Sequence, residues 1–379
     1  MPLIALTGNR NSQPLDSVLA TLAQLPVTWG GMETRLLHPG FSLLAECESP
    51  VEADALRESL AELLPDLQVA VTQAPSPADY VMTLMAPALN PAHQTAVLRK
   101  ADELGLGFVS GRSLSSGCSA GRQGWQLQFS GQVDLAAARK ALLALADNLQ
   151  VDINLQPRAG FGMSAGLICF DMDSTLIKAE CIDELAREAG IGERVSEITA
   201  QAMRGEIDFI ESFTRRMALL NGLSESVLEG IANRLELMDG AEVLINTLKA
   251  RGFHTAILSG GFNYFAEKVA ARLGIHEYHA NQLEIENGFV TGRVTGTVVD
   301  GKRKAELIQQ IAADRGLEMA NVIAVGDGAN DLPMLGLAGM GVAIHAKPLV
   351  RASADYSIST LGLDGLCYLL GLEDADIIS

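Results

Sequence analysis

Three short apolar segments of this 379-residue chain each end in oxygen-bearing side chains, and this pattern constrains the fold more than any other feature. Residues 167–170 (LICF) are followed by DMDST, residues 255–258 (TAIL) by SGG, and residues 322–325 (VIAV) by GDGAND. Short, wholly apolar runs are typical of strands buried on both faces, and open parallel sheets bind ligands beyond the carboxyl ends of their strands. The three strand ends therefore predict one pocket at one edge of a sheet.

Helical patterns alternate with the apolar runs after residue 165, which predicts an α/β domain with a Rossmann-like parallel sheet covered by helices on both faces. We expect further strands near 254–258, 321–325 and 340–344, and a small helical cap over about 180–236. Residues 282–296 carry Asn287-Gly288 between alternating residues, which predicts a hairpin that protrudes from the sheet.

The segment before the connector QPRAGFGMSAG (156–166) repeats one pattern. A strand, a helix, two strands, a helix and a strand are expected within 1–76, and this βαββαβ order recurs within 77–156, a period of about 77 residues. We therefore predict two ferredoxin-like modules, 1–76 and 77–156, followed by an α/β domain at 165–379.

Charge and composition exclude several classes of protein. A net charge of −18 argues against nucleic-acid binding, and no stretch of eighteen apolar residues offers a membrane span. The five cysteines are scattered, which argues against a zinc site or a disulfide framework. The start, MPLIALTGNRN, lacks the basic flank and cleavage site of a secretion signal, so we expect a cytoplasmic protein.

The acidic residues at the strand ends predict a metal site. Asp171, Asp173 and Asp327 would repel one another around a single pocket unless a cation lay among them. Carboxylate oxygens without nearby His or Cys favour Mg²⁺, which prefers to share its coordination shell with phosphate. The expected substrate is therefore a phosphoryl compound.

A bound phosphate also needs positive charge and hydrogen-bond donors around its oxygens. Lys304, at the start of a helical pattern, is the candidate to neutralise phosphate oxygens, with Lys302 as the alternative. Ser259 and Gly260 could supply a neutral hydroxyl and a backbone N–H.

Each motif also has an ordinary structural explanation. Asp171 and Asp173 could cap a helix, SGG could be a simple turn, and Glu180 and Arg216 could be surface charges. Residues 296–303 (GTVVDGKR) mimic a phosphate-binding P-loop, but Arg303 stands where a Ser or Thr would have to reach the metal, so we reject that interpretation.

From about 165 to 370 the chain resembles the haloacid dehalogenase-like phosphatases through DMDST, LSGGF, Lys304 and GDGANDLPML. Within that superfamily it is most similar to the phosphatases that act on phosphoserine. The further matches lie in the helical insertion: Glu180, Met203, and Phe209 with Arg216 in FIESFTRR.

The resemblance implies a mechanism in which Asp171 attacks phosphorus and becomes an aspartyl phosphate, while Asp173 protonates the leaving serine oxygen and then activates water. Such an enzyme completes serine biosynthesis. The resemblance also implies that Mg²⁺ is held by Asp171, the backbone carbonyl of Asp173 and Asp327, with Asn330 and Asp331 around the metal, its waters and the lysine. It implies that the phosphate is bound by Ser259, Gly260 and Lys304. For the amino acid end of the substrate it implies Glu180 at the ammonium, Arg216 at the carboxylate, and Met203 and Phe209 for closing the lid.

The two N-terminal modules resemble ACT-type regulatory modules, which implies a possible amino acid effector and assembly into a homodimer. The loops GNRNSQPLD (8–16) and APALNPAHQ (86–94) contain the proline of such modules but lack the glycine that follows it, which leaves effector binding open.

Two alternatives remain open. One is another small-molecule phosphomonoesterase or phosphotransferase of the same superfamily. The other is an amino acid-binding regulatory protein in which the phosphatase fold is only a scaffold, and the intact acidic residues and Lys304 speak against it.

Overall fold

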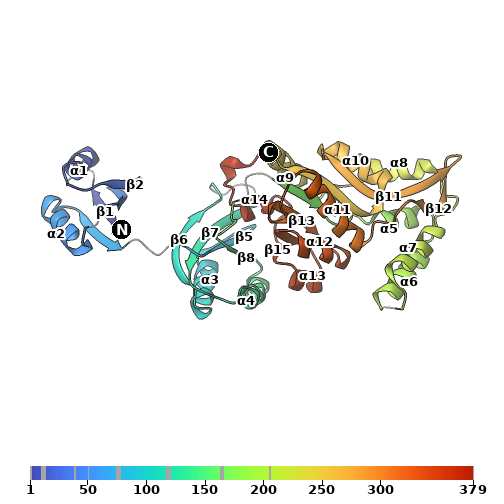
Figure 1. Ribbon diagram of the computed structural model, residues 1–379, viewed down its shortest axis with the longest axis horizontal. Helices are drawn as coiled ribbons and strands as arrows, with labels where there is room; N and C mark the ends of the chain where they lie inside the picture. The colour runs from blue at the N-terminus through green and yellow to red at the C-terminus, as the bar shows by residue number, and fades with distance from the viewer. Residues whose placement is uncertain are drawn as a thin grey trace. The chain divides into compact units, whose positions relative to one another are not determined.

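The computed structural model describes residues 2–9, 14–37, 40–49, 51–73, 78–116, 121–162, 166–204 and 206–378. The chain forms two compact units, Met1–Pro77 and Ala78–Ser379. Figure 1 labels the helices and strands of both units.

The first unit is an antiparallel sheet with strand order β2-β3-β1-β4 and two helices. Alternate residues of β3 are buried, and the helices add one apolar face each, so a single small core lies between sheet and helices. Its elements are β1 (Pro2–Asn9), α1 (Leu15–Leu22), β2 (Trp29–Leu37), β3 (Gly40–Cys47), α2 (Ala53–Leu63) and β4 (Gln68–Gln73).

The second unit begins with the same arrangement, in strand order β6-β7-β5-β8. Its helices start at good capping residues: the Asn90 side chain accepts the N–H groups of Ala92 and His93, and the Asp134 side chain those of Ala136 and Ala137. The elements are β5 (Tyr80–Ala86), α3 (Pro91–Glu103), β6 (Gly107–Ser113), β7 (Gln123–Ser130), α4 (Leu135–Leu149) and β8 (Asp152–Pro157). Both predicted βαββαβ patterns are confirmed, while the boundary at 156–166 stays a prediction.

A seven-stranded sheet in the order β12-β11-β10-β9-β13-β14-β15 forms the rest of the second unit. All neighbouring strands are parallel except β12, which is antiparallel to β11. The strands are β9 (Leu167–Phe170), β10 (His254–Phe262), β11 (Glu277–Glu286), β12 (Phe289–Thr295), β13 (Val322–Gly326), β14 (Met340–Ile344) and β15 (Tyr356–Ile358). The predicted α/β fold is confirmed.

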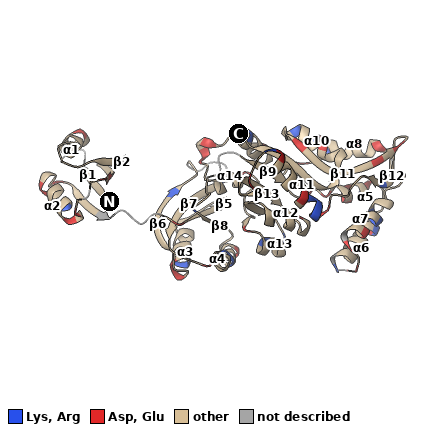
Figure 2. Ribbon diagram, viewed as in Figure 1, with Lys and Arg blue, Asp and Glu red and all other residues tan. Residues whose placement is uncertain are grey.

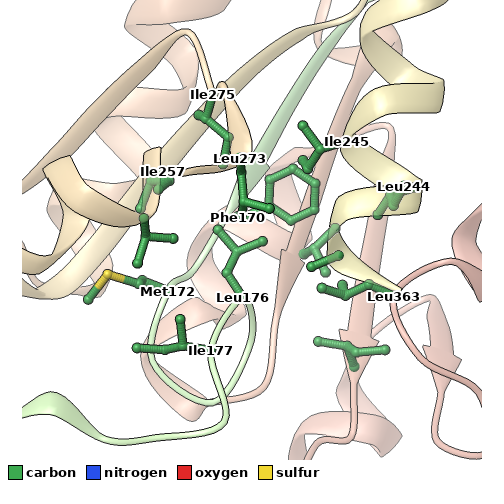
Figure 3. Packing of buried hydrophobic residues seen from close by; sticks show 14 of the residues in the cluster. Phe170, Met172, Leu176, Ile177, Leu244, Ile245, Ile257, Leu273, Ile275 and Leu363 are labelled. Atoms are coloured by element: carbon green, nitrogen blue, oxygen red, sulfur yellow. The ribbon is translucent and has the colours of Figure 1, made fainter. Parts of the chain in front are cut away.

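Side chains from the two faces of this sheet enter separate cores. On β9, Ile168 and Phe170 join one buried cluster, whereas Leu167 and Cys169 join another. Figure 3 shows Phe170 in the first cluster with Ile257 of β10 and residues of two flanking helices. The helices that follow or flank the strands are α9 (Ala241–Ala250), α10 (Asn263–Leu273), α11 (Gly301–Asp314), α12 (Leu332–Leu337), α13 (Pro348–Ser353) and α14 (Gly365–Leu369).

The helical insertion and the hairpin are both as predicted. The insertion contains α5 (Cys181–Glu188), α6 (Gly192–Met203), α7 (Phe209–Ala218) and α8 (Glu225–Arg234). The β11–β12 hairpin turns at Asn287 and Gly288, whose φ angles of 52° and 79° suit the two-residue turn that Asn-Gly favours. Within the described part of the chain, no helix is both long and apolar enough to cross a membrane.

Candidate active site

The DMDST segment makes a tight turn directly after β9. The Asp171 N–H donates to the carbonyl of Val325 at 2.9 Å, which extends the pairing of β9 with β13 by one residue. Ser174 then adopts a left-handed backbone with φ of 58°, and the Leu176 N–H returns to the Met172 carbonyl. The turn leaves Asp171 buried and Asp173 partly exposed in the cavity.

The end of β10 lies beside this turn. Ser259 is fully buried, and its Oγ accepts the Gly261 N–H at 2.9 Å, so its hydroxyl proton is left to donate elsewhere. A Cβ atom on Gly261 would lie 3.1 Å from Asp173 Oδ2, and glycine thus permits the close approach of the two segments.

The end of β13 supplies the third group of oxygens. Asp327 Oδ1 accepts the hydroxyl of Thr175 at 3.1 Å. Asp331, in the 3₁₀ turn η2 (Ala329–Asp331), accepts the Gly328 N–H at 2.9 Å. A Cβ on Gly326 would lie 2.5 Å from Asp331 Cγ, so the strand must end in glycine for Asp331 to turn back toward it.

The side chain of Lys304 contacts acidic residues that follow two of these strands. It is fully buried in the first turn of α11, which Asp300 caps, and its Nζ lies 2.8 Å from Asp171 Oδ1 and 2.7 Å from Asp331 Oδ1. Burial acts to lower the pKa of Lys304, but the two carboxylates outweigh it and raise that pKa. The lysine is therefore charged and held against Asp171, and it is not among the residues that line the cavity.

Three carboxyl groups converge here. Asp171, Asp327 and Asp331 each offer an oxygen within 4.8 Å of the other two. Burial, and next the charge of Asp331, raises the pKa of Asp171, and the same causes raise that of Asp327 to about 6. One lysine cannot offset three clustered carboxylates, so the donor set fits a hard divalent cation. The predicted set had the Asp173 backbone carbonyl in place of Asp331, and both assignments stay predictions.

Asp173 is suited to carry a proton. Its Oδ2 accepts the N–H of Cys181 at 3.2 Å, while its Oδ1 has no hydrogen-bond partner among the described residues. Burial, followed by the negative charge of Glu180, raises the pKa of Asp173 to about 7. The group can thus donate or accept a proton near neutral pH.

A cavity of about 460 Å³ opens above these groups. Arg216 of α7 and Glu180, which precedes α5, both line it, so the cap brings one cation and one anion to the same space as Asp171. Arg216 is half-buried, and burial lowers its pKa. The predicted residues that line the cavity are Asp171, Asp173, Glu180, Arg216, Ser259, Gly260, Asp327 and Asn330.

The side chains of Met203 and Phe209 lie outside what the structure describes, so their contact with a substrate stays a prediction.

Comparison with known proteins identifies the family. The haloacid dehalogenase-like hydrolase model matches residues 168–336, a range that contains all three strand ends. The phosphoserine phosphatase of Archaeoglobus fulgidus is 48% identical over 242 residues, which are 64% of this chain and 70% of the relative. This chain belongs to the phosphoserine phosphatase family of haloacid dehalogenase-like hydrolases.

Solved structures agree with this family assignment. A haloacid dehalogenase family hydrolase from Salmonella enterica serovar Typhi matches with a TM-score of 0.68 and 31% identity, over 77% of this chain and 98% of that one. A phospho-aspartyl intermediate analogue of phosphoserine phosphatase matches with a TM-score of 0.51 and 40% identity, over 54% of this chain and 98% of that one.

The polar residues Asn281 and Lys347 belong to this phosphatase-family site and are among those that the sequence did not predict. Asn281 on β11 is buried, donates to the Gly260 carbonyl at 2.8 Å and accepts the Val299 N–H at 2.8 Å, so it supports the last residues of β10. Lys347, which precedes α13, lines the cavity. An asparagine within a strand pattern was the only sequence signal for the first, and a lone surface lysine gives none.

Proposed function

We propose that this protein is a Mg²⁺-dependent phosphatase that hydrolyses O-phosphoserine to serine and phosphate through a phosphoryl group on Asp171, the last step of serine biosynthesis. The observation that carries this proposal is the meeting of Asp171 and Asp173 with Arg216 and Glu180 in one cavity. The first pair suits the phosphoryl end of the substrate, and the second pair suits its amino acid end.

In the first half-reaction a carboxylate oxygen of Asp171 forms a bond to phosphorus, and the bond between phosphorus and the serine oxygen breaks. Asp173 gives its proton to that oxygen, which its raised pKa allows. In the second half-reaction Asp173 takes a proton from water, the water oxygen bonds to phosphorus, and the bond to Asp171 breaks to release phosphate.

The charge around Asp171 must favour attack on an anion. Lys304 holds Asp171 Oδ1 in place and offsets part of its charge. Two like charges ~4 Å apart repel by roughly 1 kcal/mol in water and about 4 kcal/mol near a protein surface. Mg²⁺ held by Asp171, Asp327 and the Asp173 carbonyl or Asp331 would supply the remaining positive charge, while Ser259 and Gly260 would donate to phosphate oxygens.

The amino acid end of the substrate would be held by ion pairs. Arg216 can bind the carboxylate with two parallel hydrogen bonds, and Glu180 can accept from the ammonium group. Ser174 Oγ donates to Glu180 Oε1 at 2.8 Å, so the DMDST turn itself orients the residue that would recognise the ammonium.

A substrate panel tests the proposal. Phosphoserine should be hydrolysed with a kcat/KM at least about 100-fold above those of sugar phosphates, because they cannot pair with Arg216 and Glu180. Chelation of divalent metal should abolish turnover, and added Mg²⁺ should restore it. Equal rates for all phosphomonoesters would favour the other phosphomonoesterase activity instead, and no turnover at all would favour the scaffold alternative.

We further propose that the protein is cytoplasmic and a homodimer, and that its N-terminal modules respond to an amino acid. The two βαββαβ sheets support the last point only through their likeness to regulatory modules. Adding serine to the substrate panel tests for feedback, and light scattering tests the subunit count.

A further inference from the structure

Strand β8 fastens the module formed by β5–β8 to the edge of the seven-stranded sheet. Asn154 Nδ2 donates to the Ser357 carbonyl at 2.9 Å, and Asn154 Oδ1 accepts the Ser357 N–H at 2.9 Å. Asp152, two residues earlier on the same face, accepts the N–H groups of Ser359 and Thr360. These side chains use the free edge of β15 as a further strand would, so the module and the catalytic sheet are held as one body.

A cavity of about 290 Å³ lies along this junction, between α4 and β8 of the module and α13 and β15 of the catalytic sheet. Its charged lining residues are Arg139, Lys140, Arg351 and Asp355. Three cations and one carboxylate therefore line the cavity, and the carboxylate of Asp147 pairs with Arg351 from outside the lining. Figure 2 colours Lys and Arg blue and Asp and Glu red along the chain.

The three cations differ in what already holds them. Arg139 is bound by the carboxylate of Asp355, at 2.5 Å, and by the hydroxyl of Tyr356, at 2.6 Å. Lys140 is exposed on α4. Arg351 lies 2.6 Å from Asp147; its own side chain is 18% exposed and that of Asp147 is 53% exposed, so solvent reaches the pair from the side of the carboxylate.

Arg351 also has an unused donor. Its Nε is buried and has no hydrogen-bond partner among the described residues. An anion in the cavity could therefore attract this guanidinium, because a hydrogen bond from Nε would satisfy a buried donor that has no partner among the described residues. Lys140 and Arg351 are thus the residues that can bind a ligand, while Arg139 lines the cavity with its donors already bound to Asp355 and Tyr356.

Helix α13 lies between this cavity and the active site. Lys347, Leu349 and Val350 line the active-site cavity, and Arg351, the next residue, lines the cavity at the junction. The helix has only six residues, so the residues that line the two cavities lie within about one turn of each other.

We propose that the cavity at the junction is an effector site for a small polyanion, either a phosphate monoester or a dicarboxylate, and that α13 couples its occupancy to turnover. Lys140 and Arg351 bind the anion. The pull on Arg351 shifts α13 and with it Lys347 and Leu349 at the mouth of the active site. The site is distinct from the first module and needs no partner subunit.

Kinetics and hydrogen exchange together test this proposal. Phosphoserine hydrolysis is measured against added inorganic phosphate and, separately, succinate, at constant free Mg²⁺. Phosphate also competes at the active site and raises the apparent KM there, whereas occupancy of the effector site changes kcat, by an expected two-fold or more. The same anion should slow amide exchange over residues 348–358.

The variants Lys140→Gln and Arg351→Gln should lose the change in kcat and the slowed exchange, and they should keep the competitive part of the phosphate effect. Lys100→Gln, on α3 and outside the cavity lining, is the matched control and should behave as the unaltered protein. An effect of phosphate but not of succinate assigns the site to phosphate monoesters, and the reverse to dicarboxylates. Purely competitive inhibition with unchanged exchange over 348–358 would overturn the proposal, and the exchange result stands even if phosphoserine is not the substrate.

Discussion

Lys304 is fully buried between two carboxylates, an arrangement that is costly to build and costly to break. Removing one member of a buried ion pair typically costs about 3–5 kcal/mol, because the remaining charge keeps its desolvation penalty. Lys304 holds Asp171 in place, and its charge lowers the pKa of Asp171 in part, whereas burial and then Asp331 raise that pKa. In the proposed mechanism this stability cost positions the oxygen that attacks phosphorus.

At the same scale, Arg216→Ala should raise KM for phosphoserine at least ~10-fold while changing KM for an aryl phosphate less than two-fold, because only phosphoserine has a carboxylate to lose. Arg215→Ala is the matched control. Arg215 is the preceding residue of α7, pairs with exposed Glu211 and does not line the cavity. Parallel losses for both substrates would remove the assigned role of Arg216.

Sequence reasoning finds residues whose type is unusual for their position. Asp171 and Asp327 stand directly after strands, and Ser259 follows the apolar residues of β10, all positions where a polar side chain needs an explanation. This reasoning does not identify Asn281 and Lys347, because their roles depend on the backbone group or cavity that they contact in the folded structure.

At the scale of the elements, the strands bring the site residues together, and glycines at the strand ends allow their side chains to pack closely. In β13 the sequence predicts the strand and the acidic turn after it, but not that Gly326 packs against the Asp331 side chain. Strand β15 was not predicted, because three residues are too few for a periodic pattern.

Gly326→Ala tests this packing. Its Cβ would collide with Asp331, displace the partner of Lys304 and lower kcat by about 10²-fold, the usual effect of a misplacement of about 1 Å. Gly336→Ala in α12 is the control, since its Cβ meets no atom within 4 Å, and it should leave kcat unchanged and stabilise by roughly 0.5–1 kcal/mol. Equal kcat values for the two variants, measured with thermal unfolding alongside, would contradict the account.

At the scale of the whole molecule, polar side chains as well as apolar ones join the second module to the catalytic sheet: Asn154 binds the edge of β15, while Met85 and Leu114 lie in the same buried cluster as residues of the catalytic sheet. Sequence reasoning could predict both folds from their patterns, but β8 looked like any strand with polar residues on one face. What those residues bind is decided by the free edge of β15, which lies about 200 residues further along the chain.

Asn154→Leu should therefore lower the free energy of unfolding by about 2–4 kcal/mol, because it leaves the buried N–H and C=O of Ser357 without partners. Asn148→Leu, on the exposed surface of α4, makes the same change outside the junction and should stay within about 0.5 kcal/mol. Denaturant unfolding measures both, and similar values would show that the junction contributes little.

The covalent phosphate is the most direct measure of the whole account. Enzyme mixed with phosphoserine and quenched in acid within milliseconds should carry one phosphoryl group, stable in acid and released by base, on the peptide that contains Asp171, and Asp171→Asn should carry none while remaining folded. A quenched enzyme that turns over phosphoserine yet bears no such group, or bears it on another residue, would contradict the assignment of Asp171 as the nucleophile.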